Sequence, residues 1–155
     1  MNISKWDPKQ KDLLRELEAL EKKLFAKTAS WGGQLGREAA RRNTHLLVAR
    51  SATPDNQLVG YLVYSASGLV AHIAKLATVP SWRRRGVGRQ LVQAVHSAAK
   101  LRRIASVTLH VDAGNEAALG LYQGEGFAFD GCLEDYYGPG RNAWKMRLEL
   151  AEAWV

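Results

Sequence analysis

The feature that most constrains the fold is a change in the spacing of apolar residues at Pro80. Between His45 and Pro80 the apolar residues come in short β-type runs bounded by turn residues such as Pro54. After Pro80 they recur at helical spacing, as Val87, Leu91 and Val95 do. Short runs of this kind indicate strands, and spacings of four residues indicate an amphipathic helix. The centre of the chain is therefore predicted to be a strand meander that leads through a turn into a helix.

The flanking segments continue this mixture of helices and strands. Leucines at helical spacing predict an amphipathic first helix over about 13–24, and a second short helix is expected over 34–42. Further helices are predicted over 87–101 and 116–125, the second capped by Asn115. Strands are predicted over 45–50, 58–65, 69–79, 106–111, 127–133 and 143–150. The resulting order, α-α-β-β-β-α-β-α-β-β, predicts an α/β fold in which helices flank a mixed, mostly antiparallel sheet.

Size and composition indicate a globular protein of one domain, residues 1–155. The 155 residues are 46% hydrophobic and 24% charged, and no apolar run approaches the ~20 residues that span a bilayer. We therefore expect no contact with a membrane. The first residues lack the apolar stretch of a signal peptide, so we expect a cytoplasmic protein, or a nuclear one. The single cysteine, Cys132, cannot form a disulfide within the chain, and we expect it to be a packed thiol.

The positive charge of the chain is concentrated in its central segment. The net charge is +7, from 22 Lys and Arg against 15 Asp and Glu. No acidic residue lies between Asp55 and Asp112. The same segment holds eight basic residues, namely Lys75, Arg83, Arg84, Arg85, Arg89, Lys100, Arg102 and Arg103. This surplus indicates a polyanionic partner, and the charge alone does not distinguish nucleic acid, a membrane surface and a phosphorylated cofactor.

Two glycines, Gly86 and Gly88, lie in the turn that links the strand before Pro80 to the helix after it. The amino terminus of a helix offers unpaired backbone N–H groups, and glycine lets a phosphate approach them closely. The dinucleotide fingerprint is excluded because Leu91 stands where that motif needs a small residue. The P-loop is excluded because Arg89, and not lysine, follows the second glycine. The turn therefore predicts another kind of phosphate site, the alternative being a tight turn with solvated arginines.

Two blocks of the sequence resemble the GNAT superfamily of N-acetyltransferases. Arg83, Gly86 and Gly88 match the pattern Arg/Gln-x-x-Gly-x-Gly/Ala, which in that family binds the pyrophosphate of acetyl-CoA. The segment from Asn115 to Phe127 is similar to the family pattern Asn-x-x-Ala-x-x-x-Tyr-x-x-x-Gly-Phe. With the predicted helix pair and meander, the resemblance covers about residues 13–150. It implies an acetyl-CoA-dependent N-acetyltransferase that needs no metal and forms no acyl-enzyme.

The resemblance also implies which residues bind acetyl-CoA. The backbone of the glycine turn would hold the pyrophosphate, and the end of the preceding strand would pair with the pantetheine arm. Residues at the start of the second block would contact the arm from its other side. The residues implied are Leu76, Ala77, Thr78, Val79, Arg83, Arg84, Arg85, Gly86, Val87, Gly88, Arg89, Asn115, Ala118 and Tyr122.

Three side chains are implied to take part in catalysis. Tyr122 falls at the family position where a phenol protonates the departing thiolate. His110 falls where some N-terminal acetyltransferases carry a histidine and others a glutamate, and His72 falls where some relatives carry a tyrosine that orders a water. An imidazole with a pKa near 6.5 suits proton uptake at neutral pH. The alternatives are a core aromatic for Tyr122 and ordinary sheet residues for the two histidines.

Further features resemble the branch of the family that acetylates the α-amino group of proteins. In that branch a Tyr-Tyr pair between the last two strands binds the peptide backbone, and Tyr136 and Tyr137 match it. The loop after the first helix lines the pocket for the first side chain, which implies Phe25, although relatives often have proline where Ala26 follows. Neutralising an α-amine at pH 7 costs about 1 kcal/mol, against about 4–5 kcal/mol for a lysine, so an imidazole base suits the α-amine better.

Other functions stay open on sequence alone. The same chemistry can acetylate lysine, a polyamine or another small amine. A protein of a different class would bind CoA or nucleic acid without catalysis, but between Lys75 and Arg103 only Trp82 offers an aromatic ring for RNA bases. Lys100, Arg102 and Arg103 lie at the far end of the predicted helix from the glycine turn. They predict a weak secondary contact with an anionic partner such as the ribosome or RNA.

Overall fold

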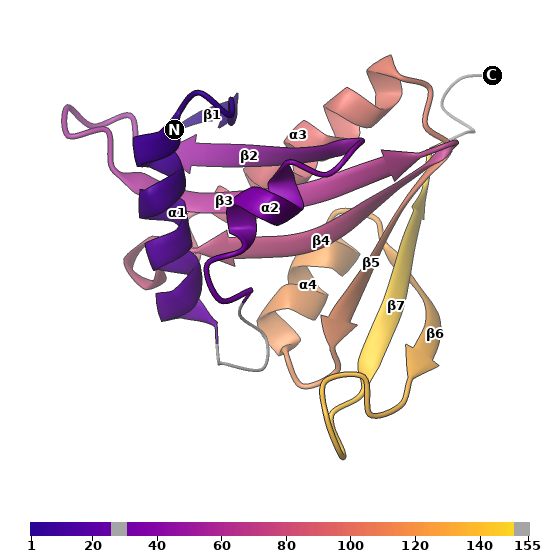
Figure 1. Cartoon of the computed structure of the whole chain (residues 1–155). Coiled ribbons are helices and arrows are strands. Elements are labelled where there is room, and N and C mark those ends of the chain that lie inside the picture. The colour runs from indigo at the N-terminus through magenta and orange to yellow at the C-terminus, as the bar shows by residue number, and fades with distance from the viewer. Residues whose placement is uncertain (26–30, 151–155) are drawn as a thin grey trace. The chain divides into compact units, whose positions relative to one another are not determined.

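The computed structural model describes residues 1–25 and 31–150 (Figure 1). The chain divides into two compact units. Unit 1 comprises Met1–Tyr64 and Lys75–Leu91, and unit 2 comprises Ser65–Ala74 and the described part of Val92–Val155. The division falls inside two strands and one helix, so these elements contribute residues to both units. That the chain is a single domain stays a prediction, and each unit is described by itself.

The elements follow the predicted order with one addition. In chain order they are β1 (Asn2–Lys5), α1 (Lys11–Leu24), α2 (Leu35–Ala39), β2 (Thr44–Arg50), β3 (Leu58–Ser67), β4 (Val70–Thr78), a 3-10 turn (Pro80–Trp82), α3 (Val87–Leu101), β5 (Ser106–Asp112), α4 (Glu116–Gly124), β6 (Ala128–Leu133) and β7 (Ala143–Glu149). The sequence analysis missed β1, a mostly exposed edge strand that pairs antiparallel with β2. It also made α2 too long, because Asn43 turns the chain with a φ of 61° soon after Ala39.

The strands form a seven-stranded sheet in the order β1-β2-β3-β4-β5-β7-β6. β4 and β5 pair in parallel, whereas β1 with β2, β5 with β7, and β6 with β7 pair antiparallel. The predicted α/β fold with a mixed, mostly antiparallel sheet and flanking helices is therefore confirmed. In the described part of the chain, no helix combines the length and the apolar character that crossing a membrane requires.

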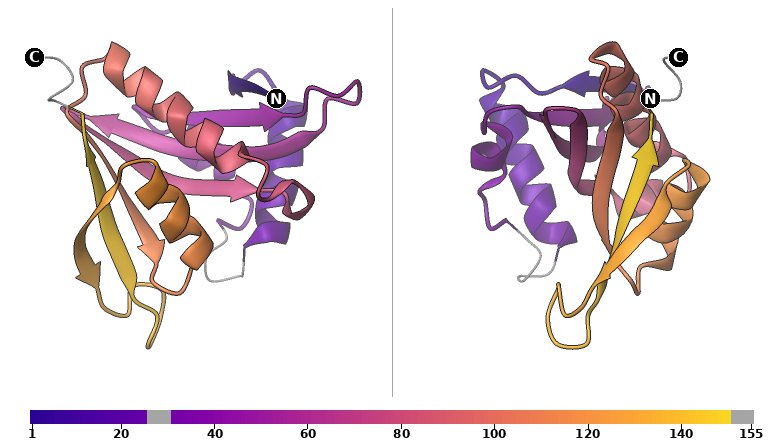
Figure 2. Two further views of the ribbon diagram at one scale, coloured as in Figure 1. Left: turned by 180° about the vertical axis from the view of Figure 1, so that it is seen from behind. Right: turned by 90° about the vertical axis from the view of Figure 1, so that its right-hand side faces the viewer.

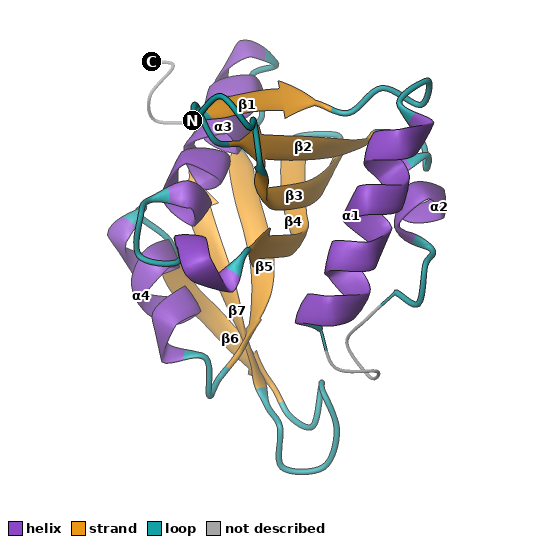
Figure 3. Ribbon diagram, turned by 90° about the vertical axis from the view of Figure 1, so that its left-hand side faces the viewer, coloured by secondary structure: helices purple, strands orange, loops and turns teal. Residues whose placement is uncertain are grey.

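Unit 1 is held together by an apolar core against which α1 and α2 pack. Leu17 of α1 and Leu35 of α2 are fully buried, together with Leu46 and Val48 of β2. Figures 1 and 3 show both helices on the same face of these strands. Burying a leucine side chain contributes about 1.5–3 kcal/mol, which is why helices with charged outer faces stay docked. Glu21 departs from this pattern, because its carboxylate is fully buried on the inner face of α1.

Unit 2 is built on the antiparallel strands β5, β7 and β6. Val107, Leu109 and Met146 fill its core, and Phe127 packs against Tyr122 of α4 with ring centroids 5.7 Å apart. Figure 2 shows α4 beside these strands and the long β6–β7 connection projecting from them. This connection contains the predicted tyrosine pair, so the strands of unit 2 form its support.

The prediction that Cys132 is a packed thiol is wrong, because Cys132 is exposed. It lies on β6, the edge strand whose pairing partner is β7. The first five residues of β6 are exposed, so side chains on both faces of this strand reach solvent. The sequence analysis missed this because a cysteine among apolar residues is usually buried, and nothing in the sequence marked β6 as an uncovered edge.

Candidate active site

The turn before α3 has the geometry of an anion site within unit 1. From the 3-10 turn the chain passes through Arg84, with a φ of 60°, and Gly86, with a φ of 79°, and enters α3 at Val87. The Gln90 N–H donates to the Gly86 carbonyl at 3.0 Å. The backbone N–H groups just before Gln90 therefore come before the first hydrogen bond of the helix. They can donate to a phosphate instead.

The charge of this turn also favours a phosphate. α3 has no acidic residue in its first turn, so no carboxylate there opposes the positive end of the helix dipole. Arg83, Arg84, Arg85 and Arg89 are exposed. The Arg85 guanidinium lies 4.9 Å from the centroid of the Trp82 ring, which supports the first part of the turn. This set of amides and arginines fits the pyrophosphate of CoA.

A glycine that the sequence analysis did not single out brings β3 close to the predicted cofactor segment within unit 1. A Cβ on Gly60 would lie 2.7 Å from the Ala77 carbonyl oxygen and 2.9 Å from Val87 Cγ1. Both distances are too short, and the first involves backbone that cannot move aside. Gly60 therefore sets the spacing at Ala77 and Val87, two of the predicted cofactor-binding residues. The available signal was a glycine inside a strand pattern, which marks a close backbone approach.

The predicted pantetheine-binding segment, residues 76–79, lies at the end of β4. The Val79 N–H donates to the Val59 carbonyl at 2.9 Å, which ties this segment to β3 on one side. The register of β4 with β5 ends earlier, where Ile73 lies opposite Leu109. An extended ligand can pair with a strand edge by backbone hydrogen bonds. The segment therefore has the backbone form that the predicted contact needs.

The two predicted catalytic histidines lie together in unit 2. His72 of β4 is directly opposite Thr108 of β5, and His110 lies two residues further along the same face of β5. The rings of His72 and His110 have centroids 5.0 Å apart and are inclined at 65°. His72 Nδ1 lies 2.8 Å from the Thr108 hydroxyl, and His110 Nδ1 lies 3.2 Å from the Tyr136 hydroxyl. Nε2 is therefore the nitrogen of each ring that can meet a substrate or a water.

The surroundings of both imidazoles favour the neutral form. Burial lowers the pKa of His72, and the neighbouring His110 lowers it further. Burial also lowers the pKa of His110, with a second contribution from the positive charge of Lys145, its partner on β7. Because the ordinary histidine pKa is near 6.5, a lowered pKa leaves a neutral ring at pH 7 that can accept a proton. Among the residues that the structure describes, no three His, Cys, Asp or Glu side chains are grouped to hold a metal ion.

The two predicted acceptor-binding tyrosines lie in the β6–β7 connection of unit 2. The Tyr136 ring packs edge-on against His110 at 5.1 Å and against Tyr137 at 4.8 Å between centroids. Arg141 fastens this connection to the end of β5, because its guanidinium pairs with Asp112 at 2.8 Å and lies 5.7 Å from the Tyr137 ring centroid. A backbone N–H and then Arg141 lower the pKa of Asp112, which keeps the carboxylate charged. The connection thus brings a predicted acceptor-binding residue into contact with the predicted base.

Helix α4 carries the remaining predicted residues of unit 2. Asn115 caps the helix by accepting a hydrogen bond from the Ala118 N–H at 3.1 Å, which confirms the predicted cap. Tyr122 is buried and packs edge-on against Phe127. Burial raises the pKa of the Tyr122 phenol, and the nearby Tyr137 raises it further. The phenol therefore stays protonated at neutral pH, as a proton donor must, although a core aromatic would also be buried.

Phe25, the predicted pocket residue, lies against a buried charge in unit 1. The Lys75 ammonium lies 4.2 Å from the centroid of the Phe25 ring and 4.2 Å from that of the Trp31 ring. It also pairs with Glu21 at 2.6 Å, and Glu21 accepts a hydrogen bond from the Trp31 N–H at 2.6 Å. Burial lowers the pKa of Lys75, and the bond and charge of Glu21 oppose this. Ala26, the position where relatives often have proline, lies outside the described residues.

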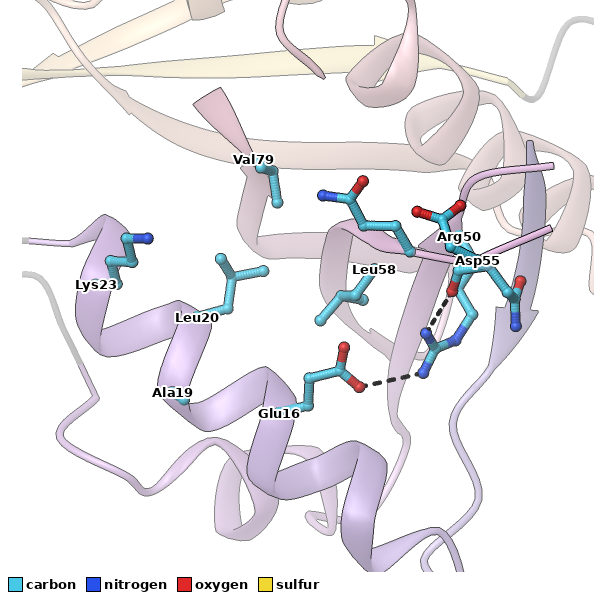
Figure 4. A pocket seen from close by; sticks show the side chains of 10 residues that line it. Glu16, Ala19, Leu20, Lys23, Arg50, Asp55, Leu58 and Val79 are labelled. Carbon is cyan, nitrogen blue, oxygen red and sulfur yellow. Dashed lines mark hydrogen bonds and ion pairs between the residues drawn. The ribbon is translucent and has the colours of Figure 1, made fainter. Parts of the chain in front are cut away.

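A separate pocket of about 520 Å³ opens in unit 1 between α1 and the β2–β3 turn (Figure 4). Figure 4 shows Glu16, Leu20 and Lys23 on its α1 side. Arg50 pairs with Glu16 at 3.3 Å within it. The lining shares Val79 with the predicted cofactor segment and contains none of the predicted catalytic residues. The pocket is lined by residues of unit 1 alone.

The predicted anionic contact falls on the end of α3 in unit 2. Lys100, Arg102 and Arg103 are exposed there, and Leu101 between them is 88% exposed. Arg103 turns the chain with a φ of 53°. Exposure is what a surface contact requires, and contact with the ribosome or RNA at this place stays a prediction.

The sequence analysis missed the partners that hold the predicted residues. Thr108 bonds to His72 from 36 residues away, and Glu21 bonds to Lys75 from 54 residues away. A lysine inside the apolar segment 69–79 was a usable signal for a buried charge, because an unpaired buried lysine is rare. No local pattern marked Thr108 or Glu21.

A comparison with protein families identifies the class of protein. The family described as "Acetyltransferase (GNAT) family" matches residues 8–127, which include the turn before α3 and the whole of α4. The chain therefore belongs to the acetyltransferase (GNAT) family. This confirms the predicted enzyme class, an acetyl-CoA-dependent N-acetyltransferase.

The chain is also similar to individual proteins of known name and to a solved structure. The chain is 30% identical over 112 residues to an N-alpha-acetyltransferase of Sulfurisphaera tokodaii, covering 64% of this chain and 67% of that protein. It is 28% identical over 85 residues to the (ribosomal protein bS18)-alanine N-acetyltransferase of Salmonella typhimurium, covering 55% of this chain and 57%, just over half, of that protein. The aminoglycoside 6'-N-acetyltransferase from Enterococcus faecium superimposes with a TM-score of 0.80 at 17% identity, covering 96% of this chain and 97% of that chain. This last likeness shows the shared fold.

Proposed function

We propose that this chain transfers the acetyl group of acetyl-CoA to the N-terminal α-amine of a protein or peptide. The observation that carries the proposal is the hydrogen bond between His110 and Tyr136, which joins a neutral imidazole to the exposed β6–β7 connection. The names of the two similar proteins from Sulfurisphaera and Salmonella support it. The acceptor peptide would bind at Tyr136 and Tyr137, and its first side chain at Phe25.

An imidazole base suits an α-amine on energetic grounds. An α-amine with a pKa of about 7.7–8.0 loses its first proton at pH 7 for about 1 kcal/mol, whereas a lysine needs about 4–5 kcal/mol. The neutral amine then attacks the acetyl carbon, and His110 accepts the proton that the nitrogen gives up, directly or through a water. The lowered pKa of His110 keeps it ready to accept that proton.

At the donor side, acetyl-CoA supplies an acetyl group activated as a thioester. The amides and arginines of the turn before α3 would bind its phosphates, and residues 76–79 would pair with its pantetheine arm. Asn115 and Ala118 would contact the arm from the other side. The Tyr122 phenol would give its proton to the sulfur as the carbon–sulfur bond breaks. One proton thus leaves the amine for His110 and one reaches the thiolate from Tyr122, and both residues recover by exchange with solvent.

The acceptor class is tested by measuring free CoA thiol released from acetyl-CoA. Three classes of acceptor are compared. They are peptides with free amino termini and varied first residues, lysine peptides with blocked amino termini, and two small amines, a polyamine and an aminoglycoside. We expect turnover on the free amino termini, lost in His110→Gln. Turnover confined to the blocked lysine peptides or to the small amines would overturn the α-amine assignment.

Binding of the donor is tested separately by thermal unfolding. We expect acetyl-CoA to raise the melting temperature more than inorganic phosphate or a short RNA at equal concentration, because it contacts both the turn and the β4 edge. Arg84→Ala combined with Arg85→Ala should reduce that shift. If acetyl-CoA gave no stabilisation and RNA did, the chain would be a nucleic-acid-binding module.

A further inference from the structure

We propose that Thr108 is a positioning residue of the reaction, whose hydroxyl fixes the orientation of the His72 ring beside His110. The consequence for catalysis rests on the proposed acetyl transfer. The assignment itself rests on the contact between Thr108 and His72 and can be tested without turnover.

The sheet register brings the two side chains together. His72 and Thr108 are direct partners in the parallel pairing of β4 with β5, so they lie side by side on one face. Thr108 Oγ1 lies 2.8 Å from His72 Nδ1, an ordinary hydrogen-bond distance. His110 projects from the same face of β5, because side chains two residues apart on a strand share a face. Strand β5 therefore carries both His110, the proposed base, and Thr108, which binds the neighbouring His72.

A hydroxyl at this position controls which nitrogen of His72 remains for other partners. A neutral imidazole has one N–H and one acceptor nitrogen, and a threonine hydroxyl can accept from the first or donate to the second. Thr108 occupies Nδ1, which leaves Nε2 to meet a water or the acceptor. Tyr136 occupies Nδ1 of His110 in the same way. Without the hydroxyl, the His72 ring can turn over and exchange its two nitrogens.

The charged groups around this face favour the neutral form of the His72 ring. On β7, Lys145 lies opposite His110, and Arg147, which is paired with Glu149, lies opposite Thr108. Asp112, further along β5, pairs with Arg141. A positive charge on His72 would be repelled by a protonated His110. His72 therefore acts as a neutral ring with fixed nitrogens.

The need to form a strand does not explain why residue 108 carries a hydroxyl group. Valine has the same branched shape as threonine and an equal preference for strands, so it would serve packing at Thr108 at least as well. Replacing Thr108 by valine therefore removes the hydrogen bond while keeping the strand. Replacing it by serine keeps a hydroxyl and removes the methyl group. The pair of variants separates a positioning role from a structural one.

The experiment compares Thr108→Val, Thr108→Ser and the control Thr44→Val, which removes a threonine hydroxyl from β2. The imidazole nitrogens of His72 are followed by ¹⁵N NMR over a pH series, and kcat and KM are measured with a peptide that the thiol assay selects. We expect the Nδ1 signal of His72 to be that of a hydrogen-bonded nitrogen in wild type and Thr108→Ser, and to lose that signature in Thr108→Val. Thr108→Val should lower kcat about 10-fold, as loss of a bond that orients a functional histidine does elsewhere, with the KM for acetyl-CoA unchanged.

The outcomes separate the inference from the function on which it rests. If the Nδ1 signal and the titration of His72 were the same in Thr108→Val as in wild type, the positioning role would be overturned. An equal loss of kcat in Thr108→Ser and Thr108→Val would also overturn it, because the hydroxyl would then not matter. If no peptide is acetylated by wild type, the proposed function fails, and the NMR comparison still decides whether Thr108 positions His72.

Discussion

Lys75 and His72 lie three residues apart on β4, yet the first belongs to a compensated ion pair and the second to a pair of neutral rings. In unit 1, the buried Lys75 ammonium meets a carboxylate and two aromatic faces. In unit 2, His72 meets a hydroxyl and a second imidazole, and its pKa is lowered by burial and by that imidazole. The first arrangement holds charge in place for stability. The second holds uncharged groups that can still take a proton.

The difference follows from what burial does to a titratable group. Burial lowers the pKa of both side chains, because it penalises the charged form. For Lys75 the bond to Glu21 opposes this effect, so the pair can remain ionised. For His72 the neighbouring His110 adds to it, so the ring stays neutral. Proton transfer therefore suits the histidines and not the lysine.

The largest expected effect comes from breaking the ion pair. Lys75→Met leaves the fully buried Glu21 carboxylate without its cation, and we expect the free energy of unfolding to fall by about 3–5 kcal/mol. Urea unfolding at pH 7 measures this. The double variant Glu21→Gln/Lys75→Met removes both charges and should recover more than half of the loss. A loss below 1 kcal/mol in the single variant would show that the pair is not buried in solution.

For the histidines we expect the opposite result, a large loss of activity with a small change in stability. His110→Gln should lower kcat by about 10²–10⁴-fold, the range that general-base catalysis contributes, and change the free energy of unfolding by less than about 1 kcal/mol. Thiol release and urea unfolding are measured on the same preparation, and the affinity for acetyl-CoA serves as the control. Activity at the wild-type level would remove His110 from the role of base.

Tyr122 tests the other proton of the reaction. Tyr122→Phe keeps the packing against Phe127 and removes the phenol, so we expect kcat to fall by about 10²-fold with little change in the affinity for acetyl-CoA. Isothermal titration with acetyl-CoA accompanies the rate measurement. An unchanged kcat would leave Tyr122 as a core aromatic only.

The pH dependence of stability should also distinguish the pair of histidines from the Lys75–Glu21 ion pair. His72 and His110 have lowered pKa values when folded, so below about pH 6.5 the unfolded chain binds more protons than the folded one. Stability is therefore retained above that pH and lost as the pH falls toward the folded pKa values. Urea midpoints at pH 7.5 and 5.5 should differ less in His72→Gln/His110→Gln than in wild type. An equal difference would place the proton uptake elsewhere.

The smallest effect is expected for an exposed ion pair on the same unit as Lys75. Arg50 pairs with Glu16 at 3.3 Å, but about half of the Glu16 side chain is exposed. Arg50→Gln should lower the free energy of unfolding by less than about 1 kcal/mol, since solvent screens such pairs. The same urea assay checks it against Lys75→Met, and a loss as large as that of Lys75→Met would show that burial does not set the difference.

Features that depend on a short stretch of sequence were the ones the sequence predicted well. The turn from Arg83 to Gly88 and the Asn115 cap are local, because each is formed by residues within a few positions of one another. The strand and helix order followed from periodicity in the same way. Tyr122 was assigned from its resemblance to the family pattern that begins at Asn115, and its burial agrees with both a catalytic and a core role.

Features that depend on register between distant strands were missed. The Glu21 to Lys75 pair and the Thr108 to His72 bond each join residues far apart in the chain, and periodicity does not tell which residues face each other across strands. The exposure of Cys132 was missed for a related reason, since it depends on β6 being the last strand of the sheet. Pattern alone therefore located the candidate residues and left their partners undetermined.

The exposed edge strand β6 has a practical consequence for studying the enzyme. Cys132 is the single cysteine of the chain and lies in solvent, so each molecule adds one reactive thiol to any reagent that detects thiols. Release of CoA measured with such a reagent would begin with a fixed contribution from the protein itself. The same thiol offers one defined point for attaching a fluorophore or spin label to unit 2, and Cys132→Ser supplies the unlabelled reference.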